Sequence, residues 1–198
     1  MSQPTSLCVY CGSSSGGHPE YAEQAAAFGT AMARRGMALV YGGGKVGLMG
    51  TVADAVLAAG GKATGVIPRQ LVALEVAHPG LSELVVVETM HQRKTRMYEL
   101  SDAFVALPGG FGTMDEMFEM LTWAQLGLHR YPCAFLDVRG YYRDLRAMVE
   151  HMVAEKFVKP GQRDSVWFGD SMNALFDWME SYDGGSASRV IGPASVKA

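Results

Sequence analysis

Cysteine is scarce in this 198-residue chain, which carries only Cys8, Cys11 and Cys133. Three thiols are too few for a disulfide scaffold. Cys8 and Cys11 have the C-x-x-C spacing of redox and zinc motifs, but they lie on an apolar run that predicts a buried strand. Side chains three residues apart on a strand face opposite sides of the sheet. We therefore interpret both as buried thiols, not as a metal or redox pair.

Long apolar segments and a positive net charge are also missing. No run of about 18 apolar residues occurs, and the first residues lack the basic start and apolar core of a signal peptide. The formal net charge is −3, whereas binding to a phosphate backbone needs a basic face. We therefore expect a cytoplasmic protein with no membrane or nucleic-acid partner. The five histidines show no H-E-x-x-H or comparable spacing, so no metal site is predicted.

Short apolar runs alternate with amphipathic stretches along most of the chain. Strands are predicted at residues 6–11, 37–41, 63–67, 84–87, 103–107, 133–137 and 165–168. Helices are predicted at residues 19–35, 47–59, 90–101, 113–127, 141–155 and 171–182. This alternation predicts an α/β fold, a doubly wound parallel sheet of about seven strands with helices on both faces. Residues 1–183 are expected to form one domain and residues 184–198 a flexible tail.

Small and glycine-rich turns follow the first two predicted strands, and in open parallel sheets ligands bind at the carboxyl ends of strands. After the second strand comes YGGGKVGLMG at residues 41–50. Bare N–H groups at Gly43 and Gly44, together with the positive end of the following helix, favour an anion site. The alternative is that these glycines only let strand and helix pack closely. The GSSSG at residues 12–16, with Ser13, either donates hydroxyls to a ligand or forms a simple loop.

A second glycine-rich turn, LPGGFGTMDE at residues 107–116, also runs into a predicted helix. Thr113 is the expected cap of that helix and a candidate phosphate donor. A carboxylate at Glu116, beside an anion-binding loop, would meet ribose hydroxyls, where it could align water or stabilise positive charge. The alternative is structural, because Thr113-x-x-Glu116 is also the pattern of a capping box.

Three cations lie in MHQRKTRM at residues 90–97, in the first turns of a predicted helix. The helix dipole disfavours positive charge at that end. One hypothesis is therefore that an anionic or polar ligand compensates Arg93 and Lys94. The alternative is a solvated basic face, the expected state of Arg96.

Together these motifs resemble the LONELY GUY family of cytokinin-activating phosphoribohydrolases, sometimes labelled lysine decarboxylase-like. The matching segments are VYCGSSSG (9–16), YGGGKVGLMG (41–50), VIPRQL (66–71), MHQRKTRM (90–97), PGGFGTMDE (108–116) and LTWAQLG (121–127). The pairing of PGGFGTMDE with MHQRK is specific, whereas either glycine cluster alone is not. A decarboxylase would need a Schiff-base lysine in a pyridoxal site, and neither Lys45 nor Lys94 has that setting.

The resemblance implies a Rossmann-like fold, no cofactor, and hydrolysis of AMP or N6-substituted riboside 5′-monophosphates to base and ribose 5-phosphate. It places the catalytic pair at Arg93 and Glu116. The expected substrate-binding residues, from the turns and the resemblance together, are Ser13, Gly43, Gly44, Glu75, Arg93, Lys94, Gly109, Gly110, Phe111, Gly112, Thr113, Met114, Asp115, Glu116 and Thr122. Two alternatives remain: base exchange between ribosyl donors, and a nucleotide carrier or sensor without turnover.

The helix predicted at residues 113–127 is apolar on nearly every face. Such a helix is expected to be buried all round. The sheet can cover only one side, so a second subunit would cover the other. We therefore expect a homodimer, and the family resemblance points the same way.

Overall fold

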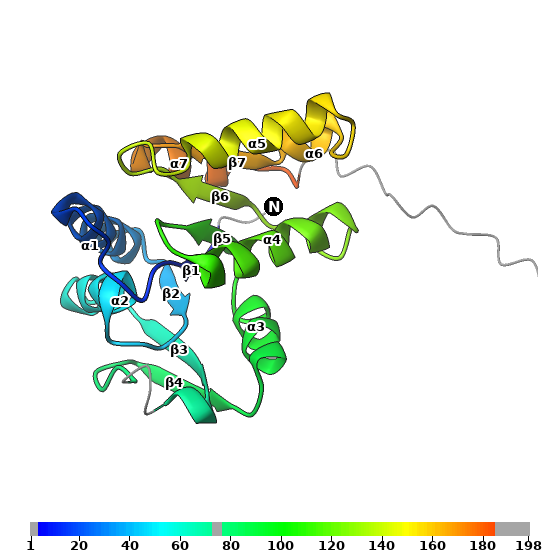
Figure 1. The fold of residues 1–198 in the computed structure, drawn as a ribbon. Coiled ribbons are helices and arrows are strands. Elements are labelled where there is room, and N and C mark those ends of the chain that lie inside the picture. Colours follow the sequence, from blue (N-terminus) through cyan, green and yellow to red (C-terminus); the bar gives the residue numbers. More distant parts are fainter. Residues whose placement is uncertain (1–3, 73–76, 185–198) are drawn as a thin grey trace, which may run out of the picture.

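The computed structural model describes residues 4–72 and 77–184. Its centre is a parallel seven-stranded sheet in the order β4-β3-β2-β1-β5-β6-β7, which confirms the predicted α/β fold (Figure 1). The strands are β1 (Ser6–Tyr10), β2 (Ala38–Tyr41), β3 (Ala63–Pro68), β4 (Glu83–Val87), β5 (Ala103–Ala106), β6 (Cys133–Leu136) and β7 (Val166–Gly169). The helices are α1 (Pro19–Arg34), α2 (Gly47–Ala58), α3 (Met90–Glu99), α4 (Phe111–Gln125), α5 (Arg143–Ala154), α6 (Pro160–Asp164) and α7 (Met172–Ser181), with a 3₁₀ turn η1 (Arg69–Leu71).

The direction of winding reverses at β1. Strands β2 to β4 follow on one side of β1, and β5 to β7 on the other. In β1, Cys8 is in register with Val40 of β2 and with Phe104 of β5. The loops that leave β1 and β5 therefore start next to each other at the carboxyl edge of the sheet. Such a switch point opens a crevice for a ligand.

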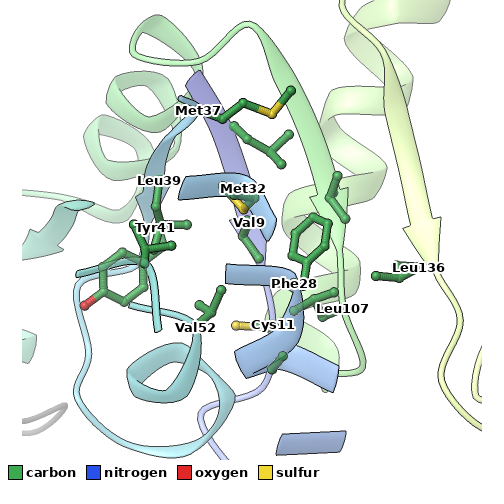
Figure 2. Close-up of a cluster of buried hydrophobic side chains, with 14 of the residues drawn as sticks. Val9, Cys11, Phe28, Met32, Met37, Leu39, Tyr41, Val52, Leu107 and Leu136 are labelled. Atoms are coloured by element: carbon green, nitrogen blue, oxygen red, sulfur yellow. The ribbon is translucent and has the colours of Figure 1, made fainter. Parts of the chain in front are cut away.

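Helices cover both faces of the sheet. On one face α1, α2 and α7 pack on the strands around Phe28, Val52 and Phe176. Figure 2 shows side chains of the strands meeting those of α1 and α2 in this layer. On the other face α3, α4 and α5 pack around Met97 and Met117. Each fully buried side chain of this kind stabilises the fold by roughly 1.5–3 kcal/mol. The loops at the carboxyl edge are therefore attached to a tightly packed sheet.

The cysteines are buried on opposite sides, as predicted. Cys8 packs in the layer of α3 and α4, and Cys11 in that of α1 and α2. Burial raises the pKa of both thiols, and it raises the pKa of Cys133 to about 12. Protonated thiols on opposite faces cannot form a joint metal or redox site.

Every predicted strand and helix is present, with ends displaced by at most two residues. The short η1 and α6 were not predicted because segments of three and five residues carry no periodic signal. Residues 73–76, which include Glu75, and residues 185–198 lie outside the described part, so the one-domain organisation with a tail stays a prediction. Among the helices of the described part, none has the length and apolar character to cross a membrane.

Candidate active site

A cavity of about 330 Å³ lies in the crevice beside the carboxyl ends of β1 and β5. Small-molecule sites span roughly 300–1,000 Å³. Its walls come from the loop after β1 and from the first turns of α3 and α4. The predicted site residues that line it are Ser13, Arg93, Gly110, Phe111, Gly112, Thr113, Asp115 and Glu116. The tertiary structure therefore brings the predicted catalytic pair into one cavity.

A second hollow, of about 260 Å³, continues the crevice across the loop after β1. It shares Gly12, Ser13 and Gly110 with the first. Tyr21 and Tyr141 form its outer wall, and the Tyr141 hydroxyl donates to the carbonyl of Gly109. The two hollows therefore lie side by side on the loop after β1 and the start of α4.

The N-terminus of α4 opens onto the first cavity. Its N-cap is Gly110, and no side chain caps the helix. The first N–H groups of a helix, here those of Phe111, Gly112 and Thr113, have no partner within the helix. A methyl group at Gly110 would meet no atom within 4 Å, so the approach to these N–H groups is open. With the positive end of the helix dipole, this is an anion-binding site.

The capping box considered for Thr113 and Glu116 does not form. Because α4 begins at Phe111, the expectation that Thr113 is its N-cap is wrong. Thr113 is buried, and its hydroxyl fills the space left by Gly109, where a Cβ would lie 2.1 Å from Oγ1. Glu116 lies in the second turn, out of reach of the N-cap. Its side chain takes no part in capping α4 and forms part of the cavity wall.

The negative charge of Glu116 affects the pKa of two residues at the end of β1, Tyr10 and Cys11. Burial raises the pKa of Tyr10 and Cys11, and the negative charge of Glu116 raises both further. The thiol and the phenol therefore stay protonated near neutral pH and offer no competing nucleophile.

In residues 4–72 and 77–184, no group of three or more His, Cys, Asp or Glu side chains could hold a metal ion.

Arg93 is anchored by backbone carbonyls after β2 and within β3. Its side chain is buried; Nε donates to Val66 O at 3.1 Å and Nη2 donates to Gly42 O at 2.9 Å. Glycine at position 42 leaves room for this side chain, since a Cβ there would lie 2.1 Å from Nη2 and would displace the guanidinium. A capping box between Thr89 and Gln92 fixes the first turn of α3. The guanidinium therefore has one defined orientation at the cavity wall.

The other cations of α3 have partners within the protein. Lys94 Nζ lies 2.7 Å from Asp115 Oδ2 and 3.4 Å from Glu119 Oε2. Arg96 pairs with Glu99 at 3.1 Å, one turn along the helix. The hypothesis that a ligand compensates these charges is therefore not needed for either residue. Lys94, expected to bind substrate, does not line the cavity.

The N-terminus of α2 is closed by the protein itself. The carbonyl of Gly12 accepts hydrogen bonds from the N–H groups of Leu48 (3.0 Å) and Met49 (3.3 Å). Gly43 and Gly44 are buried and outside both hollows, and Gly43 has a φ of 79°. The glycines after β2 thus serve close packing, the alternative that the sequence left open. The anion site predicted at the start of α2 is not supported, because two of the first N–H groups of this helix already donate to Gly12 O.

Other predicted residues lie apart from the cavity. Thr122 donates to Phe118 O at 2.8 Å and lines a separate groove between α4 and α5. Met114 is half-buried on the sheet side of α4. The cavity residues not predicted are Cys11, Gly12, Met49, Leu71 and Met90. They contribute backbone or apolar surface and carry no chemical signal in the sequence, although Gly12 follows the first strand at the predicted switch point.

Sequence comparison links the chain to one family. A family model described as "Possible lysine decarboxylase" matches residues 49–179. A cytokinin riboside 5′-monophosphate phosphoribohydrolase of Rhodococcoides fascians is 51% identical over 164 residues, covering 82% of this chain and 83% of that protein. A protein of the same name from Arabidopsis thaliana is 44% identical, covering 89% of this chain and 82% of its own length.

Solved structures share the fold at lower identity. The molybdenum cofactor binding protein of Rippkaea orientalis superimposes with a TM-score of 0.68 at 20% identity, over 89% of this chain and 95% of that one. The molybdenum cofactor carrier protein of Chlamydomonas reinhardtii gives 0.68 at 17% identity, over 89% and 96%. These similarities concern the Rossmann-type architecture alone.

Proposed function

Because the chain belongs to the LONELY GUY family of cytokinin riboside 5′-monophosphate phosphoribohydrolases, we propose that Arg93 and Glu116 are its catalytic pair. The enzyme cleaves the N-glycosidic bond of a nucleoside 5′-monophosphate and releases the free base and ribose 5-phosphate. AMP and its N6-substituted cytokinin forms are the proposed substrates. The observation that carries the proposal is the single cavity that joins Arg93, Glu116 and the open N-terminus of α4.

In this mechanism the phosphate binds the N–H groups at the start of α4, with Ser13 and Thr113 as hydroxyl donors. Breaking the C1′–N9 bond builds oxocarbenium-like charge on the ribose. The carboxylate of Glu116 stabilises that charge and orients the attacking water. Arg93 supplies a fixed positive charge in the same wall, which orients Glu116 or assists departure of the base. No cofactor has a part in these steps.

Product analysis tests the reaction. The protein is incubated with AMP and with isopentenyl-AMP, and the released bases and ribose 5-phosphate are separated by chromatography. Both products in equal amounts are expected. A nucleotide that is bound but not cleaved would indicate a carrier or sensor. Incorporation of a labelled second base into nucleotide would indicate base exchange, because it requires a sugar intermediate that outlives the first base.

Substitution of Arg93 tests its fixed geometry. Arg93→Lys keeps the charge but cannot donate to both Val66 O and Gly42 O as the planar guanidinium does. A displacement of about 1 Å at a catalytic group costs roughly 10²-fold, so we expect Arg93→Lys to lose at least that in kcat. Initial rates of adenine release measure it, with Arg96→Lys, on an exposed pair, as the matched control. Full activity in Arg93→Lys would contradict the requirement for a planar donor.

The outer face of α4 is proposed to bind a second copy of the chain. In α4, Met117 and Met120 are buried, while Leu121 and Trp123 are only half-buried. Beyond the helix end, Leu128 is 62% exposed. This face borders a groove of about 230 Å³ between α4 and the α5–α6 region. Exposed apolar surface of this kind marks an interaction site, and identical chains usually pair by two-fold symmetry.

A charge in that groove is expected to break the homodimer. Ala124 lines the groove and is half-buried, so Ala124→Arg can be accommodated in a single chain but not beneath a partner. Light scattering at micromolar concentration should show a dimer for the wild type and a monomer for Ala124→Arg. The control is Ala27→Arg, at an exposed position of α1. A monomeric wild type would refute the homodimer.

A cytoplasmic location is also part of the proposal. Its support is that all three cysteines are free and buried, a state suited to a reducing compartment. Cell fractionation followed by immunodetection tests this location.

A further inference from the structure

The turn between β5 and α4 is held by hydrogen bonds to three consecutive carbonyl groups. Each donor belongs to a segment that is distant in sequence, either the loop after β1 or the loop after β6. The three bonds run from the Tyr142 hydroxyl to Leu107 O (2.6 Å), from the Gly12 N–H to Pro108 O (3.0 Å) and from the Tyr141 hydroxyl to Gly109 O. The side chains after β6 therefore determine which way two of these carbonyls point.

The last of these carbonyls belongs to the peptide unit between Gly109 and Gly110. Glycine has no Cβ and adopts backbone conformations that are closed to other residues, so a peptide flanked by two glycines can turn over at little cost. The C=O and N–H of a trans peptide point in opposite directions. Such a rotation would exchange the carbonyl of Gly109 for the N–H of Gly110. The hydrogen bond from Tyr141 selects one of the two orientations.

The orientation of this peptide affects the charge that the cavity presents. Gly110 lines both hollows and directly precedes the N–H groups of Phe111 and Gly112 at the start of α4. With the carbonyl of Gly109 turned to Tyr141, the N–H of Gly110 points away from Tyr141. Successive backbone N–H groups form an anion-binding concavity, whereas a carbonyl oxygen among them would repel an anion.

Tyr141 is held in place by contacts that do not involve its hydroxyl. Its ring packs edge-on against Tyr21 and Tyr142, with centroid distances of 6.0 Å and 5.1 Å. The backbone N–H of Tyr142 donates to Asp137 Oδ1 at 3.1 Å, which fixes the loop after β6. A phenol has a single proton to donate, and that of Tyr141 goes to Gly109 O. The side chain is 44% exposed, so this hydroxyl orients the turn without forming part of the core.

We propose that Tyr141 is a positioning residue of the anion site: it holds the carbonyl of Gly109 outward, so that the N–H of Gly110 joins those at the start of α4 in binding the 5′-phosphate. The inference rests on the proposed function, because it presumes that a phosphate binds at this helix end. Without the hydroxyl, the peptide populates both orientations, and the phosphate loses one charge-assisted hydrogen bond.

Tyr141→Phe removes the hydroxyl and keeps the ring contacts. We expect kcat/KM for AMP to fall about 10- to 100-fold, the effect of one charge-assisted hydrogen bond. The rate on adenosine should stay within about twofold, because adenosine has no phosphate to lose that bond. The Kd of ribose 5-phosphate, measured by calorimetry, should weaken by the same factor as kcat/KM for AMP. Tyr21→Phe is the control, since its hydroxyl lies in the same wall but is not one of the three donors to the turn.

The amide nitrogen signal of Gly110 in NMR spectra tests whether Tyr141 acts through Gly109. This nitrogen is bonded to the carbonyl carbon of Gly109, so loss of the hydrogen bond to Gly109 O should move the signal in the ligand-free Tyr141→Phe protein. The signal should stay in place in Tyr21→Phe. A hydroxyl that only contacts the phosphate would leave the ligand-free signal of Tyr141→Phe unmoved, and that result would overturn the proposal.

The remaining outcomes separate this inference from the proposed function. Equal losses on AMP and adenosine, or a Tyr141→Phe protein that no longer folds, would make Tyr141 a structural residue and overturn the inference. An active wild type whose Kd for ribose 5-phosphate is unchanged in Tyr141→Phe overturns the inference alone. A wild type that binds ribose 5-phosphate but releases no base from AMP overturns the proposed function, while the Kd ratio and the Gly110 signal still decide the role of Tyr141.

Discussion

Glu116→Gln is expected to lower kcat by about 10²- to 10⁴-fold, the range for loss of a positioned acid–base group. The amide keeps the size of the carboxylate but loses the negative charge that stabilises an oxocarbenium-like ribose. Stability should barely change, because the amide keeps the shape of the side chain and its capacity to accept hydrogen bonds, and the position lies outside the cap of α4. The experiment compares adenine release from AMP and thermal unfolding for the wild type and the variant.

The matched control is Glu99→Gln, which neutralises an exposed carboxylate at the end of α3. It should leave kcat within a factor of two or so, since surface ion pairs contribute only about 0–1 kcal/mol. If a folded Glu116→Gln enzyme turns over at a near-normal rate, the carboxylate is structural and the proposed mechanism is wrong. A loss confined to KM would place Glu116 in substrate binding instead.

The second large effect is expected from the 5′-phosphate. Adenosine should be cleaved about a thousandfold less efficiently than AMP, because it loses two or more charge-assisted hydrogen bonds of about 1.5–3 kcal/mol each. About 4 kcal/mol corresponds to a thousandfold. Binding energy from this remote group also positions the scissile bond, so kcat should fall as well as affinity. Steady-state rates on both substrates measure the ratio, and ribose 5-phosphate should inhibit competitively.

Gly110→Ala tests whether the 5′-phosphate binds at the N-terminus of α4. The added methyl has open space around it in the protein, so the fold should accept it. It stands at the mouth of the anion site, however, so KM for AMP should rise at least about tenfold while the slow reaction of adenosine hardly changes. Gly17→Ala, also in open space but outside both hollows, is the control. Equal rates on adenosine and AMP would mean that the start of α4 binds no phosphate, and the site assignment would fail with it.

The elements of the fold could be predicted because their signals are local. Apolar runs of four to six residues separated by amphipathic stretches mark a parallel sheet covered on both faces, and every predicted element is present. The motif around Arg93 and Glu116 was equally visible, since both lie at the starts of helices that follow strand ends. A parallel sheet brings all such positions to one edge.

The roles of the glycines could not be decided from the sequence. Both glycine-rich turns have the same local pattern, a strand followed by a helix start. At α2 the carbonyl of Gly12, more than 30 residues away in the chain, occupies the N–H groups. At α4 the N-cap has no side chain and the helix end stays open. What distinguishes the two turns is therefore a contact between segments that are distant in sequence.

The sequence by itself determined the order of strands and helices along the chain, and it predicted the carboxyl edge as the place of the site and the residues proposed as the catalytic pair. Only the tertiary structure decided which helix end is open, that Gly42 makes room for Arg93, and that Lys94 pairs with Asp115 and Glu119. The physical reason is the separation in sequence over which each kind of interaction acts. Hydrophobic periodicity and turn chemistry act over a few residues, whereas the partner of a buried charge or of a free N–H group is chosen by whichever distant segment the fold brings within about 3 Å.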